Sequence, residues 1–127
     1  MKNGMKLTTY MVAFAFGASL ALPALSLGAE AKAGGETKTI KGEVVDLMCY
    51  LDHGAKGEKH KGCAKKCIEG GGPVGLLTAD DQLYLVIGDH QPLNKELSGK
   101  AAETVTLKGK VVERNGIKMI ENAELQE

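Results

Sequence analysis

The sequence predicts a mainly β protein, a small barrel of five short strands with one or two short helices, preceded by a signal peptide. From residue 37 onward, short segments of β-branched and other apolar residues alternate with polar residues, and turn signals separate the segments. Beyond the signal, the chain has fewer than a hundred residues and two aromatic side chains, Tyr50 and Tyr84. A chain of this size can bury only one modest core.

The first 29 residues have the pattern of a removable signal peptide. Lys2 and Lys6 supply a positive start, and residues 11–22 form an uncharged apolar run. Small residues and Pro23 follow, as expected near a cleavage site. The run is shorter than the roughly 20 apolar residues of a spanning helix, so an uncleaved membrane anchor is the weaker alternative. We therefore expect a periplasmic or secreted protein with no membrane span after cleavage.

Residues 30–36 are polar and contain glycine, which predicts a linker before a single domain at 37–127. Loss of Lys2 and Lys6 with the signal leaves a mature chain with a formal charge of −2. Neither this charge nor export suits a nucleic-acid partner. The composition is compatible with a protein partner but does not identify one.

The first part of the domain predicts a strand, a loop and a helix. Residues 39–48 read as a strand, with a bulge where Val44 and Val45 crowd the alternation, and the strand leads directly into Cys49. Residues 52–62 have no apolar period and predict a loop. Residues 63–69 predict a short helix, because three glycines and Pro73 follow as a stop.

The rest of the domain predicts four more strands. Asn115-Gly116 is a strong hairpin signal between the last two of them. The predicted elements are, in order, a strand at 74–78, a turn at 79–82, a strand at 83–87, a short helix within 93–100, a strand at 104–113 and a strand at 117–125. Five strands with a helix between the third and fourth match the Greek-key barrel called the OB-fold, and a sandwich of the same strands is the alternative.

One segment, residues 49–67, holds all three cysteines and two of the three histidines. Cys63 and Cys67 are four residues apart, which places them on one face of the predicted helix. Cys49 follows the first strand, and His53 and His60 lie between the cysteines. Three thiolates and one imidazole would complete a tetrahedral Cys3His site. Such donors select a soft transition metal ion, zinc or cuprous copper, and this metal-binding module is the predicted function.

Two other roles remain open for the cysteines. A disulfide from Cys49 to Cys63 or Cys67 would staple the loop of a structural or interaction barrel and leave one thiol over. A thiol redox protein is the third interpretation, although the chain lacks Cys-x-x-Cys. No catalytic motif is recognisable, so no enzymatic activity is predicted.

Several neighbours of the cluster have predicted secondary roles. Asp46 and Asp52 could orient a ligating histidine or simply be solvated. His90 reads as a turn residue rather than a ligand. Five lysines surround the cluster and would favour thiolates, or would only keep the loop in solvent: Lys56, Lys59, Lys61, Lys65 and Lys66.

The segment resembles a functionally uncharacterised family of small exported bacterial proteins. In that family a Met-Cys…His…Cys-x3-Cys…Gly segment leads into a small β-barrel that ends in a Val-x-Gly-x-Val strand, here residues 107–111. The resemblance covers residues 40–125 and implies an OB-like barrel of which the cluster is a defining feature. The chain is also broadly similar to periplasmic OB-fold proteins that include copper chaperones. Those chaperones bind copper through methionine and histidine under an aromatic lid, whereas this chain has no tryptophan.

Overall fold

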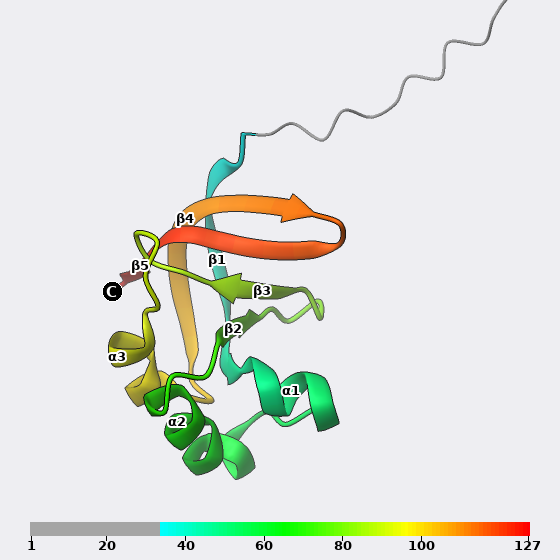
Figure 1. Ribbon diagram of the computed structural model, residues 1–127, viewed down its shortest axis with the longest axis vertical. Coiled ribbons are helices and arrows are strands. Elements are labelled where there is room, and N and C mark those ends of the chain that lie inside the picture. The colour runs from blue at the N-terminus through cyan, green and yellow to red at the C-terminus, as the bar shows by residue number, and fades with distance from the viewer. Residues whose placement is uncertain (1–33) are drawn as a thin grey trace, which may run out of the picture.

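Five strands close into a barrel in the order β1-β2-β3-β5-β4 in the computed structural model, which describes residues 34–127 (Figure 1). Neighbouring strands are antiparallel except β3 and β5, which run parallel. β1 pairs with both β2 and β4 and so closes the barrel. The strands are β1 (Glu36–Asp46), β2 (Val74–Leu77), β3 (Leu83–Val86), β4 (Thr104–Arg114) and β5 (Ile117–Gln126). The predicted five-stranded, OB-fold-like barrel is confirmed.

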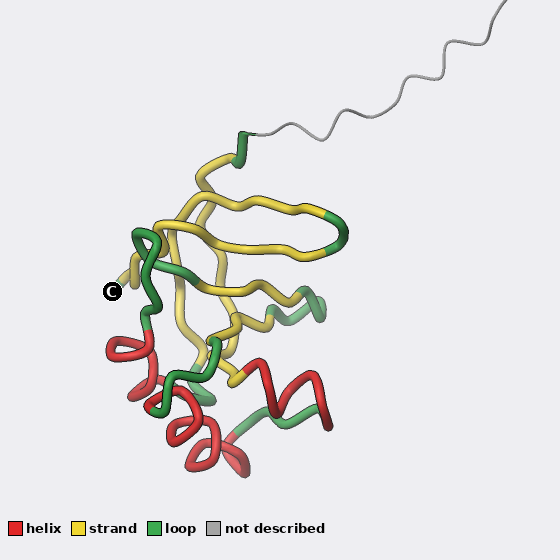
Figure 2. The backbone as a smooth tube through the Cα atoms, in the orientation of Figure 1, coloured by secondary structure: helices red, strands yellow, loops and turns green. Residues whose placement is uncertain are grey.

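The helical segments gather at one end of this barrel, as Figure 2 shows. Three of them connect β1 to β2 and two connect β3 to β4. They are α1 (Leu47–His53), the 3-10 helix η1 (Glu58–His60), α2 (Lys61–Glu69), α3 (Asn94–Leu97) and the 3-10 helix η2 (Ser98–Lys100). The helix predicted at 63–69 is thus confirmed as α2 with an earlier start, and the helix predicted within 93–100 is divided between α3 and η2. Among residues 34–127, no helix is both long and apolar enough to cross a membrane.

The start of the domain lies earlier than predicted. β1 begins at Glu36, so the last residue of the predicted linker 30–36 already pairs with Val111 of β4. The predicted signal peptide at 1–29 lies outside the described residues, as does most of the linker. The strands and helices of the described chain lie between Glu36 and Gln126.

β1 ends two residues earlier than predicted and contains no bulge where one was expected. Val44 and Val45 pair in regular register with Leu76 and Gly75 of β2. Both valines are buried because the barrel is covered on two sides at this end. Val44 belongs to the main core, whereas Val45 lies with Leu47 of α1 close to Gly75. The two adjacent apolar residues therefore reflect a strand end that is buried on both faces. The one register shift between paired strands lies instead at 108–110 of β4, among the described residues.

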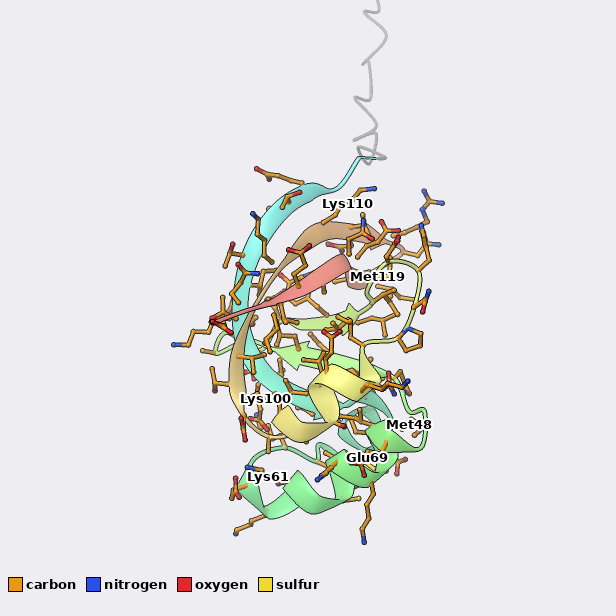
Figure 3. The ribbon with its side chains drawn as sticks, turned by 90° about the vertical axis from the view of Figure 1, so that its left-hand side faces the viewer. Met48, Lys61, Glu69, Lys100, Lys110 and Met119 are labelled. Carbon is orange, nitrogen blue, oxygen red and sulfur yellow. The ribbon has the colours of Figure 1, made fainter. Side chains whose placement is uncertain are left out.

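α2 is fixed at both ends, which matters because it carries two of the cysteines. Its buried Ala64 and Ile68 belong to the barrel core. At its C-terminal end, Asn94 Nδ2 donates to the carbonyls of Ile68 at 2.6 Å and Gly72 at 2.8 Å. At its start, Lys61 Nζ donates to Glu103 Oε1 at 3.2 Å. Figure 3 shows Lys61 and Glu69 at the two ends of this helix.

We predict that Asn94→Ala lowers the free energy of unfolding by about 1–3 kcal/mol, because it leaves two carbonyl groups without their side-chain donor. Urea denaturation measures the change. Lys95→Ala is the matched control, since Lys95 is an exposed neighbour on α3 and its loss should cost less than about 0.5 kcal/mol. Equal stabilities for the two variants would show that Asn94 does not hold α2.

Candidate metal centre

Cys49 lies on a helix and not at the end of a strand, which corrects the prediction from the sequence. Asp46 ends β1 and caps α1, because its Oδ2 accepts a hydrogen bond from the Cys49 N–H at 3.0 Å. Gly54 ends α1 with a left-handed φ of 70°. An aspartate followed eight residues later by glycine is a helix signal that the sequence contained and that the strand interpretation passed over.

The three cysteines converge, as predicted. The Sγ atoms of Cys49, Cys63 and Cys67 all lie within 4.8 Å of one another. Cys49 comes from α1, and Cys63 and Cys67 come from successive turns of α2. Cys63 is exposed, whereas the other two are partly buried, and all three are free thiols. We call these three side chains the sulfur cluster; it has one side open to solvent and one side toward the barrel.

A buried carboxylate lies on the barrel side of the sulfur cluster. Asp46 is only 1% exposed, and within the described residues its Oδ1 has no hydrogen-bond partner. A methyl group added to Gly72 would lie 3.0 Å from this Oδ1, 2.9 Å from the Met48 methyl carbon and 2.8 Å from the Cys67 carbonyl oxygen. Glycine at position 72 therefore leaves room for the Asp46 side chain beside the cysteines. Met48, next to Cys49 on α1, lies near the C-terminal end of α2 (Figure 3).

The carboxylate and burial together raise the pKa values of the two nearest thiols. Hydrogen bonding to Asp46, together with burial, raises the pKa of Cys49 to about 12. Burial first, and then the charge of Asp46, also raises the pKa of Cys67. Of the two roles predicted for the surrounding lysines, favouring thiolates is therefore not met at these two cysteines, whereas keeping the loop in solvent remains open. All of these lysines except Lys61 are exposed, and several pair with acids, for example Lys65 with Glu69, so solvent screens most of them.

The predicted histidine ligand is not in the cluster. Within residues 34–127, the group of metal-binding atoms that lie within 4.8 Å of one another contains three cysteines and no histidine. His53 ends α1 and His60 ends η1. Both fall at the loop between the two cysteine-bearing helices, so their rings meet each other, with centroids 6.3 Å apart. A Cys3His shell would need one of them to move inward.

The remaining predicted neighbours separate into distinct places. His90 lies in a turn and pairs with Glu121 of β5, its Nδ1 3.5 Å from the carboxylate, which agrees with a turn residue. Asp52 is exposed and contacts His53, with Nδ1 and Oδ2 3.2 Å apart, so both predicted roles of Asp52, solvation and orientation of a histidine, stay open. Asp46, in contrast, is buried beside the cysteines, a difference from Asp52 that the sequence does not reveal.

The donor set suits a soft metal ion. Three sulfur atoms from two helices already lie close enough to share one ion, and no backbone movement between distant elements is needed to bring them together. Thiolates bind zinc or cuprous copper in preference to magnesium or calcium. The unpartnered Oδ1 of buried Asp46 would gain from a positive charge nearby. The residues present therefore fit a thiolate-bound metal with a fourth position on the solvent side.

Comparisons with family models, with curated proteins and with solved structures found no match for this chain. The interpretation of the site therefore depends on its own geometry.

We predict that Asp46→Asn lowers the pKa of Cys49 toward the value of about 8.5 for a free cysteine, because it removes the negative charge while keeping a capping side chain. At pH 9 the metal-free variant should then hold more Cys49 as thiolate and react faster with iodoacetamide. Labelling followed by peptide mass spectrometry gives the rate for each cysteine.

The matched control is Asp52→Asn, since Asp52 is an exposed acid on the same helix. This variant should leave the labelling rate of Cys49 unchanged. If Asp46→Asn reacts no faster than the wild type at pH 9, the carboxylate does not govern the thiol.

Proposed function

We propose that this chain is an exported metal-binding module that holds a soft transition metal ion, Zn(II) or Cu(I), through Cys49, Cys63 and Cys67. The observation that carries the proposal is the convergence of three Sγ atoms within 4.8 Å of one another. The function is binding, for storage or delivery of the ion. No reaction of a substrate is part of the proposal.

The solvent side of the cluster favours exchange over permanent burial. Cys63 is exposed, and the three thiolates leave one position of a tetrahedral shell for a fourth ligand. Structural zinc sites are usually closed by four protein ligands. An imidazole that moves inward from His53 or His60 would give the predicted Cys3His shell, and a ligand from a receiving protein could take the same position.

Export is inferred from the first 29 residues, whose charge and apolar pattern are those of a signal peptide. Export of the protein across the membrane would place its thiols in an oxidising compartment. There, a bound metal ion would protect the thiols from oxidation, because a thiolate coordinated to the ion is not free to form a disulfide.

A disulfide-stapled barrel is the second candidate, and the same sulfur positions favour it. Cys49 lies on α1 and faces cysteines on α2, so a bond from Cys49 to either of them would link two helices. Closure of this loop of about 15–20 residues could stabilise the fold by about 3 kcal/mol. A thiol redox protein is less well supported, because the pKa values of Cys49 and Cys67 are raised, whereas reactive cysteines have lowered values.

The test uses mature protein exported by a bacterial host and purified without reductant or chelator. Elemental analysis should find close to one zinc or copper ion per chain, and the intact mass should equal that of three reduced thiols. Cys67→Ser should weaken binding by more than the roughly 10–100-fold that loss of an outer-shell partner causes. Removal of the metal should then make all three cysteines accessible to alkylation.

His90→Ala is the matched control, since His90 lies in a turn and pairs with Glu121, outside the sulfur cluster. It should bind metal as the wild type does. Metal-free protein that is lighter by two hydrogens would instead support the disulfide-stapled barrel and overturn the proposal.

A further inference from the structure

The two histidines that stay outside the sulfur cluster form a pair of their own. The rings of His53 and His60 have centroids 6.3 Å apart and planes inclined by 60°. The two residues come from different elements, the last turn of α1 and the end of η1. The side chain of His53 is 54% exposed, and His60 is half-buried. Imidazole is the commonest protein ligand for metal ions, so two rings at this separation suggest a shared ligand.

The loop between the two histidines is anchored, so their proximity is built into the fold. Ala55 is buried. The N–H of Gly57 donates to Glu43 of β1, and the N–H of His60 donates to the carbonyl of Gly57 at 2.9 Å. These contacts tie the loop to the barrel wall and restrict the separation of His53 and His60.

Asp52 supplies a second and independent indication of a ligand. Its Oδ2 lies 3.2 Å from Nδ1 of His53. This contact directs Nδ1 toward the carboxylate, so Nε2 is the nitrogen that could bind an ion. Metal-binding histidines commonly make this arrangement, in which a carboxylate orients the ring and increases the basicity of the nitrogen that binds the ion.

The pair lies one step outward from the sulfur cluster along both helices. His53 follows Cys49 by four residues on α1, which is one helical turn or about 5.4 Å. His60 precedes Cys63 by three residues at the start of α2. The ligating atoms of neither histidine belong to the three-sulfur group. The two donor sets are therefore adjacent and chemically distinct, with nitrogen outside and sulfur inside.

We propose that His53 and His60 form a second, outer site for a borderline divalent ion such as Zn(II), from which the ion passes to the sulfur cluster. The outer site is independent of the proposed function, whereas the transfer step rests on it. In the transfer, two zinc–nitrogen bonds break and zinc–sulfur bonds form. The thiols release their protons to solvent, and no electrons move.

The rings need only a small adjustment to share an ion. With zinc about 2.0–2.1 Å from each nitrogen in a tetrahedral shell, the two ring centres would be roughly 5 Å apart. The observed 6.3 Å therefore requires an approach of roughly 1 Å. A rotamer change of the exposed His53 side chain can supply it, since exposed side chains change rotamer within nanoseconds.

The outer site is tested in a chain from which the inner site has been removed. The triple variant Cys49→Ser, Cys63→Ser, Cys67→Ser should still bind one Zn(II) in calorimetry, and nitrogen-15 NMR should show the bound nitrogens of His53 and His60. Adding His53→Ala and His60→Ala should abolish this binding, whereas adding His90→Ala should not. Absence of zinc binding by a folded triple variant overturns the outer site.

The transfer is tested with Co(II) as a spectroscopic probe of zinc sites, in protein with reduced cysteines. Sulfur-to-cobalt charge-transfer absorption reports loading of the inner site. In His53→Ala, His60→Ala the loading at low cobalt, measured as a fraction of that variant's own final absorption, should be slower by roughly tenfold, because the local store of ion is lost. Unchanged kinetics overturn the transfer. Absence of charge-transfer absorption in the wild type overturns the proposed function and leaves the result for the outer site standing.

Discussion

The carboxylate of Asp46 is the feature on which the arrangement of this molecule depends. It ends β1, caps α1 through the Cys49 N–H and lies 1% exposed beside the cysteines. Without that cap the start of α1 would be less stable, and the change from strand to helix at this point would be less favourable. The turn places Cys49 opposite Cys63 and Cys67, so one side chain connects the closure of the barrel to the convergence of the sulfur atoms.

The same carboxylate makes the sulfur cluster a site for a cation. Ionised thiols would add negative charge beside a buried carboxylate. The pKa of Cys49 is raised by its hydrogen bond to Asp46 and by burial, and the pKa of Cys67 is raised by burial and by the charge of Asp46. Exposed lysines weaken the repulsion between these negative charges little, because water and salt screen them. A bound metal ion would remove this repulsion, since its positive charge offsets the charges of the thiolates and of Asp46 together. Metal binding and release of the thiol protons are therefore coupled.

The sequence predicted the barrel well because its strands carry the information locally. Alternating apolar residues and the Asn115-Gly116 turn fix the last two strands within a few residues. It also predicted that three sulfur atoms meet. It did not predict α1, because β-branched residues run up to Val45 and the capping signal of Asp46 and Gly54 was outweighed. In the structure, α1 places Cys49 opposite α2 and places His53 one turn farther from the cluster. Because α1 was not predicted, the separation of the histidines from the cysteines was not predicted either.

The spacing along the two helices explains why nitrogen and sulfur donors are separated. Successive turns of α2 give Cys67 and then Cys63, and His60 comes three residues before Cys63; α1 gives Cys49 and then His53. The donors therefore change from sulfur to imidazole with distance from Asp46. A soft ion therefore gains affinity as it moves from the imidazoles toward Asp46, because thiolates bind it more strongly than imidazoles do. The hydrogen bonds of Asn94 and the bond from Lys61 to Glu103 hold α2 on the barrel. The order of sulfur and nitrogen donors along α2 is therefore fixed by the fold.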